Sequence, residues 1–291
     1  MIGFLRLIRW PNLLIVLVTQ ILTRQCLVID TSLHPYDFGF LVFSTLLIAA
    51  AGYIINDYYD VDTDVINKPQ KVIIGNEISR KAAFNWYWIF NLLGILLGFY
   101  VGYKLHKINL GMIQIICAGL LYFYSTTYKG MVILGNLIIA FLSALALLIC
   151  GLFEPAVYGG YNLLIISGYA AFAFLLSLSR EMIKDLEDIE GDQAAGHRTL
   201  PIVYGLEKSK NTIIGILLLT IALLAWVQIQ LIMGDWISQL YFVVMVQIPL
   251  IYLLVYIKNA KNKFDFHRAG KFNKWIMLAG ILSMIIFYLS L

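Results

Sequence analysis

The sequence predicts an all-α, polytopic membrane protein. Sixty-one per cent of its 291 residues are hydrophobic and only 13% are charged, a composition that excludes a soluble globular protein. The apolar residues fall into runs close to the roughly 20 residues that an α-helix needs to cross a bilayer. No separate soluble domain fits between these runs, so we expect one domain over residues 1–291.

Nine apolar runs are candidate transmembrane helices. In chain order they cover residues 12–30, 38–55, 82–103, 108–124, 131–152, 163–180, 212–233, 236–257 and 275–291. Nine spans place the two ends of the chain on opposite sides of the membrane.

Basic residues gather on one side of this predicted bundle. Only Arg24, Lys104 and Lys107, of the 21 lysines and arginines, fall on the other side. Cytoplasmic loops carry the excess of Lys and Arg in membrane proteins. We therefore expect a multi-pass protein of the cell membrane, with a cytoplasmic N-terminus and an outside C-terminus.

The first acidic stretch, NDYYDVDTD at residues 56–64, follows the second apolar run directly. At 100° per residue, four of its polar side chains share about 100° of a helix surface: Asn56, Asp57, Asp60 and Asp64. Two like charges about 4 Å apart repel by roughly 4 kcal/mol at an effective dielectric constant near 20. Such a face requires cations and predicts a metal site, although a single charged run can also be a solvated helix end.

The second acidic stretch, REMIKDLEDIEGD at residues 180–192, follows the sixth apolar run in the same way. Four of its carboxylates share a face: Glu181, Asp185, Asp188 and Asp192. Arg180 and Lys184 lie beside them. Since both stretches end spans on the predicted cytoplasmic side, we expect them to face each other as halves of one metal site.

A third cytoplasmic segment, residues 122–136, lies between the two stretches. It contains Lys129 among several tyrosines. A lysine with tyrosines at a membrane boundary is ordinary anchoring. Beside two metal-binding faces, the same lysine is a candidate contact to phosphate.

Two carboxylate faces next to an apolar interior suit a prenyl diphosphate. Mg²⁺ is usually held by a few carboxylates together with substrate phosphates and water. Basic side chains would stabilise the leaving diphosphate, and aromatic faces would stabilise an allylic cation. A cation-coupled transporter is the rival class, but transporter acids usually lie near the middle of the membrane on broken helices, whereas these lie at span ends.

Several motifs resemble those of a known family. NDYYDVDTDVINKP is similar to the NDxxDxxxD motif of the UbiA superfamily of intramembrane prenyltransferases, and KDLEDIEGD resembles its second aspartate-rich motif. RWPN at Arg9, the YS and Lys129 pair before GN, and the GHRTLP segment also resemble the family, in the right order. The resemblance covers essentially the whole chain and implies nine helices around a central cavity that binds a prenyl diphosphate through Mg²⁺.

The resemblance also implies roles for individual residues. The metal ligands would be Asn56, Asp57, Asp60, Asp64, Asp185, Asp188 and Asp192. The diphosphate contacts would be Lys129, Lys184, Arg180 and Arg9, together with Lys71, which stands where many relatives carry an arginine-proline pair. Asp60, Asp188 and Lys129 would be the residues on which catalysis depends most directly.

The acceptor is predicted from the second motif region. Residues 180–201 are most similar to the members that transfer a geranylgeranyl group to geranylgeranylglyceryl phosphate, a glycerophosphate ether alcohol. Members that prenylate homogentisate, naphthoate or chlorophyllide share much of the pattern. We expect a lipophilic alcohol as acceptor, with an aromatic ring of quinone or pigment synthesis as the alternative.

Overall fold

A computed structural model describes residues 2–28, 31–67, 70, 72–154, 157, 161–231 and 234–290. These residues form helices and turns and contain no β-strand. The α-helices are α1 (Ile2–Leu7), α2 (Trp10–Leu22), α3 (Pro35–Tyr59), α4 (Val61–Asn67), α5 (Arg80–Lys104), α6 (Met112–Thr126), α7 (Leu134–Leu152), α8 (Tyr161–Glu187), α9 (Ile189–Ala194), α10 (Leu200–Tyr204), α11 (Leu206–Leu231), α12 (Trp236–Phe242), α13 (Ile248–Asn259) and α14 (Lys263–Ser290).

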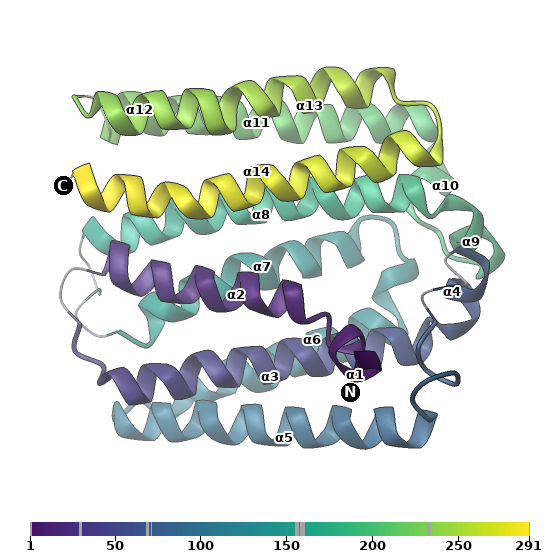
Figure 1. Cartoon of the computed structure of the whole chain (residues 1–291), viewed down its shortest axis with the longest axis horizontal. Helices are drawn as coiled ribbons and strands as arrows, with labels where there is room; N and C mark the ends of the chain where they lie inside the picture. The colour runs from purple at the N-terminus through teal and green to yellow at the C-terminus, as the bar shows by residue number, and fades with distance from the viewer. Residues whose placement is uncertain are drawn as a thin grey trace.

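The long helices lie side by side with their axes along one common direction (Figure 1). α5 forms one edge of the bundle, and α11, α12 and α13 form the opposite edge. The short helices α4, α9 and α10 lie together at one end, and the C-terminus lies at the other end. α4 packs against α9, so the helices that contain the ends of the two acidic stretches meet although they are more than a hundred residues apart in the chain.

Eight helical segments among the described residues are long and apolar enough to span a membrane. They are Pro35–Tyr59, Arg80–Lys104, Ile108–Thr126, Leu134–Leu152, Asn162–Glu187, Leu206–Gln230, Trp236–Asn259 and Lys263–Ser290, and each overlaps one predicted run. Large apolar side chains, among them Trp88, Trp226 and Trp275, are exposed on the outside of the bundle. The fold is that of an all-α, polytopic membrane protein.

The first predicted span, residues 12–30, is not among these eight. It corresponds to the 13-residue helix α2 and the five-residue π-helical turn Thr23–Leu27 that continues it. α2 lies alongside the spans, close to α3 and α7 (Figure 1). The count of nine spans therefore stays a prediction.

Two helices extend well beyond the apolar runs that predicted them. α8 continues to Glu187, past the predicted end at residue 180, and α14 begins at Lys263 instead of 275. At the start of α14, Asn262 Oδ1 accepts a hydrogen bond from the Asp265 amide, and Asp265 Oδ2 accepts one from the Asn262 amide. This reciprocal capping box fixes a helix start twelve residues before the apolar run begins.

Small residues allow α3 to pack closely between α5 and α6. A Cβ on Gly94 would lie 2.7 Å from the Ile48 side chain, and a Cβ on Gly52 would lie 2.7 Å from Leu121. The hydroxyl of Ser44 donates a 2.6 Å hydrogen bond to the Gly94 carbonyl across the α3–α5 contact. Close approach at small residues is a common way to pack transmembrane helices, and here it fixes the helix that carries the first acidic stretch.

The largest buried cluster lies around α8. Leu176 and Ile183 of α8 pack with Ile213 of α11, Leu250 of α13 and Ile276 of α14, and all five are 2% exposed or less. This cluster fixes the position of the second acidic stretch at the end of α8.

Candidate active site

Each acidic stretch contains a helix break at an aspartate. Asp60 separates α3 from α4 with φ −89° and ψ 0°, and Asp188 separates α8 from α9 with φ −102° and ψ 12°. This region of backbone space is sparsely populated and is often used by active-site residues. The two motifs are thus alike in backbone conformation as well as in sequence.

The helical register nevertheless continues through both breaks. The Asp60 amide donates to the Asn56 carbonyl at 3.0 Å, and the Asp64 amide donates to the Asp60 carbonyl at 2.8 Å. In the second stretch, the Asp188 amide donates to the Lys184 carbonyl at 2.9 Å, and the Asp192 amide donates to the Asp188 carbonyl at 3.0 Å. Side chains four residues apart therefore remain on one face, as expected for an unbroken helix.

The two motif faces line one cavity of about 610 Å³, here called the acidic chamber. Its carboxylates are Asp57, Asp60, Asp64, Glu181, Asp185, Asp188 and Asp192, and its basic residues are Arg6, Arg9, Lys129 and Lys184. Asn56, Tyr124 and Asn136 also contribute to the wall. The structure thus brings together both predicted carboxylate faces and most of the predicted basic contacts.

Asp60 is only 5% exposed and has two partners in the chamber. The Lys129 ammonium forms an ion pair with it, and Asn56 Nδ2 donates a 2.6 Å hydrogen bond to the same carboxylate oxygen. Lys129 lies on a tight turn directly before α7. A Cβ on Gly135 would lie 3.0 Å from Lys129 Cα and 2.9 Å from the Tyr128 carbonyl, so glycine at 135 allows this turn to lie close to α7.

Arg9 closes the chamber on the α2 side. Its backbone is left-handed, with φ 50° and ψ 52°, and its guanidinium donates to Asp57 Oδ1 at 2.7 Å. The same guanidinium lies 5.0 Å from the centre of the Tyr53 ring. Burial alone would lower the pKa of Arg9, but the Asp57 carboxylate, together with the Tyr53 and Tyr124 hydroxyls, more than offsets this and raises the pKa above its ordinary value.

The second motif has neighbours to which sequence analysis gave no role. Asn136 Nδ2 donates a 2.9 Å hydrogen bond to Asp185, and His197 Nδ1 lies 3.1 Å from Asp192 Oδ1. The Arg198 amide donates to the Gly130 carbonyl at 2.7 Å, which joins this loop to the Lys129 turn. The GN pair after Lys129 was the only sequence signal for Asn136. The GHRTLP segment contains His197, but sequence analysis gave this histidine no role.

Two predicted diphosphate contacts are not seen in the chamber. Arg180 lines a different cavity, and Lys71 lies outside the described residues. Glu181, which was not among the predicted metal ligands, lines both cavities.

The chamber's donor set fits a metal that substrate helps to bind. Burial raises the pKa of Asp64, and repulsion by the Asp60 carboxylate raises it further, so a cation would relieve unfavourable charge here. Within the described residues, no three acidic, histidine or cysteine side chains converge closely enough to enclose an ion alone. Mg²⁺ commonly takes only a few carboxylates and completes its octahedron with water and phosphate oxygens, which is the arrangement that an open set of this kind suits.

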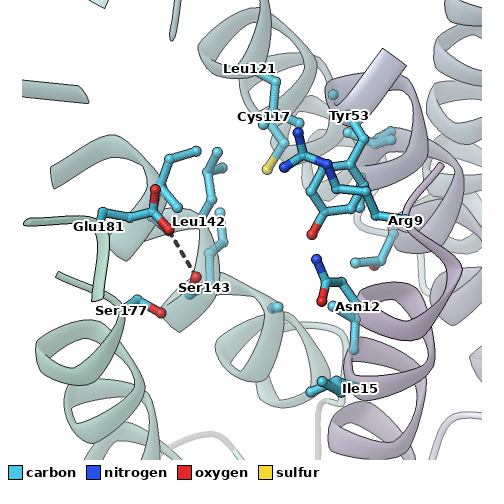
Figure 2. A pocket seen from close by; sticks show the side chains of 18 of the residues that line it. Arg9, Asn12, Ile15, Tyr53, Cys117, Leu121, Leu142, Ser143, Ser177 and Glu181 are labelled. Carbon is cyan, nitrogen blue, oxygen red and sulfur yellow. Dashed lines mark hydrogen bonds between the residues drawn. The ribbon is translucent and has the colours of Figure 1, made fainter. Parts of the chain in front are cut away.

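A second cavity of about 320 Å³, here called the inner cavity, lies among α2, α3, α6, α7, α8 and α14. Much of its wall is apolar, including Ile48, Leu121, Leu142 and Met277. Figure 2 shows polar side chains on both sides of it, with Glu181, Ser143 and Ser177 on one and Arg9, Asn12 and Tyr53 on the other. The two cavities share Arg9, Asn56, Tyr124, Glu181 and Lys184, so the acidic chamber adjoins an apolar interior.

The chain is similar to proteins of one family along most of its length. Residues 16–285 match the model of the UbiA prenyltransferase family. Digeranylgeranylglyceryl phosphate synthase of Methanosphaera stadtmanae is 32% identical over 252 residues, which cover 86% of this chain and 88% of that protein. The synthase of the same name from Methanobrevibacter smithii is 31% identical over 241 residues, covering 82% and 81%.

Solved structures give the same result. A structure of digeranylgeranylglyceryl phosphate synthase superposes with a TM-score of 0.74 at 27% identity, covering 99% of this chain and 98% of that one. A UbiA homolog from Archaeoglobus fulgidus bound to GPP and Mg²⁺ shares the fold, with a TM-score of 0.63 at 18% identity over 97% and 99% of the chains. This chain therefore belongs to the UbiA prenyltransferase family and is a membrane-embedded prenyltransferase.

Proposed function

We propose that this protein transfers a geranylgeranyl group from geranylgeranyl diphosphate to the hydroxyl of geranylgeranylglyceryl phosphate, with Mg²⁺ as cofactor. The observation that carries the proposal is that the acidic chamber opens onto the inner cavity. The wall of the inner cavity is largely apolar and also carries four basic side chains. The names of the relatives from Methanosphaera and Methanobrevibacter support the acceptor. GPP and Mg²⁺ in the Archaeoglobus homolog support a metal-bound diphosphate.

In this proposal the acidic chamber binds the diphosphate. The metal ligands are drawn from Asn56, Asp57, Asp60, Asp64, Asp185, Asp188 and Asp192. Bound Mg²⁺ would neutralise the diphosphate oxygens and make the diphosphate a better leaving group. Lys129, Lys184 and Arg9 donate hydrogen bonds to oxygens that the metal leaves free.

The reaction takes place where the two cavities meet. The acceptor's hydroxyl oxygen attacks C1 of the prenyl group, the C1–O bond breaks, and the diphosphate leaves with the electron pair while the hydroxyl loses its proton. Positive charge develops on the allylic carbons as this bond breaks. The rings of Tyr53 and Tyr124, which line the inner cavity beside the chamber, stabilise that charge.

The hydrocarbon chain lies among the membrane spans. The apolar wall formed by α3, α6 and α7 removes isoprenoid surface from water, which is worth about 25 cal/mol per Å². We also propose that the end of the bundle with α4 and α9 faces the cytoplasm, that the C-terminus lies outside, and that residues 1–291 act as one domain. The excess of basic residues at the motif end supports this orientation.

The test uses purified protein, Mg²⁺ and radiolabelled geranylgeranyl diphosphate. Geranylgeranylglyceryl phosphate and a panel of aromatic acids are supplied in parallel. The proposal predicts label in the doubly prenylated glycerophosphate. Label in an aromatic product would instead assign the protein to quinone or pigment synthesis.

A further inference from the structure

The inner cavity carries more positive charge than its carboxylates balance. Its wall contains four basic side chains, Arg9, Arg180, Lys184 and Lys274, and only one carboxylate, Glu181. Arg9 is paired with Asp57 of the acidic chamber, so the excess positive charge lies on the other three. Uncompensated charge in an apolar environment is unfavourable unless a counter-charge or a polar ligand binds to it. The diphosphate site lies in the acidic chamber, so it does not account for basic residues that line only the inner cavity.

Lys274 is one of these residues. It is half-buried on α14, and its ammonium donates a 2.7 Å hydrogen bond to Asn12 Oδ1 on α2. An amide oxygen accepts the hydrogen bond but leaves the charge in place. No carboxylate forms an ion pair with Lys274 in the part of the chain that the structure describes.

Arg180 is the second such residue. One of its terminal nitrogens donates to Glu181 Oε1 at 2.6 Å, which leaves the other donors of the planar guanidinium for a ligand. Arg180 also lies near enough to Lys274 for the two positive charges to repel each other. The two positive charges of Lys274 and Arg180, with the Asn12 amide bound to Lys274, can therefore bind an anion that has no metal ion of its own.

We propose that Lys274, Arg180 and Asn12 form the subsite that binds the phosphate monoester of the acceptor lipid. The inference rests on the proposed function, because it assigns one part of that acceptor. A lysine supplies a point charge and an arginine supplies a fork of donors, and both suit phosphate oxygens. Asn12 lines the same cavity and accepts the hydrogen bond of the lysine ammonium.

The subsite also positions the reacting hydroxyl. In geranylgeranylglyceryl phosphate, the phosphate and the free hydroxyl are on neighbouring glycerol carbons. Arg180 directly precedes Glu181, which lines both cavities. A phosphate bound by Lys274 and Arg180 therefore holds the adjacent hydroxyl near the junction where the prenyl diphosphate is cleaved. An acceptor that lacks the phosphate loses this contact, so the subsite determines specificity.

The experiment compares two acceptors in wild-type protein and in Lys274→Met. The acceptors are geranylgeranylglyceryl phosphate and its dephosphorylated form, geranylgeranylglycerol. The ratio of kcat/KM for the phosphorylated over the dephosphorylated acceptor should fall about tenfold in the variant, the effect of one charge-assisted hydrogen bond. The KM for geranylgeranyl diphosphate should remain that of the wild type.

A second measurement does not require turnover of the dephosphorylated acceptor. Glycerol 1-phosphate, the soluble headgroup, should inhibit the wild type competitively against the acceptor, and its inhibition constant should rise about tenfold in Lys274→Met. Lys274→Arg should restore most of the inhibition because it keeps the charge. Lys271→Met is the matched control, since Lys271 lies on the same helix and is exposed.

The outcomes separate this inference from the proposed function. If the wild type prenylates the glycerophosphate, but Lys274→Met keeps both the acceptor ratio and the inhibition constant, the subsite is wrong and the proposed function stands. If Lys274→Met loses activity with both acceptors equally, Lys274 has only a structural role. If the wild type transfers label only to aromatic acids, both proposals are wrong.

Discussion

The acidic chamber and the inner cavity adjoin each other, yet their charges are opposite. The chamber is lined by seven carboxylates and four basic side chains, whereas the inner cavity has four basic side chains and one carboxylate. Both proposed ligands are anions, so charge attraction alone does not explain the difference. A diphosphate that binds with Mg²⁺ requires acids for the metal, while a phosphate that binds without metal requires bases.

Removal of Mg²⁺ should produce the largest difference between the two cavities. With EDTA, prenyl transfer should fall to background and binding of geranylgeranyl diphosphate should be lost, since the chamber's carboxylates would then repel it. Binding of geranylgeranylglyceryl phosphate, measured by titration calorimetry, should persist. Loss of both ligands, or of neither, would remove the distinction between a metal-dependent and a metal-independent site.

Replacement of the aspartates at the helix breaks should have the next largest effect. Asp60→Ala and Asp188→Ala should each lower kcat/KM by about 10³-fold, the scale seen when preorganised electrostatic contacts are lost. Asp62→Ala is the matched control, because Asp62 lies in the same stretch and is exposed. Wild-type activity in the two break variants, with unchanged thermal unfolding, would contradict their assignment to the metal site.

Lys129→Met should lower kcat by about 10²-fold, because Lys129 stabilises the leaving diphosphate. Its effect should differ from that of Lys274→Met, which acts on the acceptor. Steady-state kinetics with each substrate varied in turn would separate the two. An increase in the KM for the acceptor in Lys129→Met, with kcat unchanged, would mean that this lysine belongs to the other site.

The smallest expected effect comes from the turn that holds Lys129. A Cβ on Gly135 would lie 3.0 Å from Lys129 Cα, so Gly135→Ala should shift the turn by a few tenths of an ångström and lower kcat by about threefold to tenfold. Gly119→Ala on α6 is the control, since a Cβ there meets nothing within 4 Å. Equal activity in both variants would show that the position of Lys129 is not critical.

Sequence alone predicted the all-α membrane fold and the two carboxylate faces that line the acidic chamber. Both depend on local regularities, namely apolar run length and the 100° rotation per residue of a helix. The breaks at Asp60 and Asp188 were not predicted. At both breaks, each aspartate amide still donates to the carbonyl four residues earlier, so the periodicity of the side chains is unchanged.

Lys274 illustrates what hydropathy does not reveal. The predicted last span began at residue 275, which left Lys274 in a cytoplasmic loop. Because the Asn262–Asp265 capping box starts α14 at Lys263, Lys274 lies about 16 Å along the helix, at 1.5 Å per residue. Its contact with Asn12 joins residues 262 positions apart in the chain, and no local pattern contains such information.

The most direct test of the account is a single competition assay. Wild-type protein receives Mg²⁺, radiolabelled geranylgeranyl diphosphate, and equal concentrations of geranylgeranylglyceryl phosphate, geranylgeranylglycerol and an aromatic acid. The account predicts that nearly all label enters the phosphorylated product, that EDTA abolishes transfer, and that added Mg²⁺ restores it. Label divided equally between the phosphorylated and dephosphorylated acceptors, or found in the aromatic product, would contradict it.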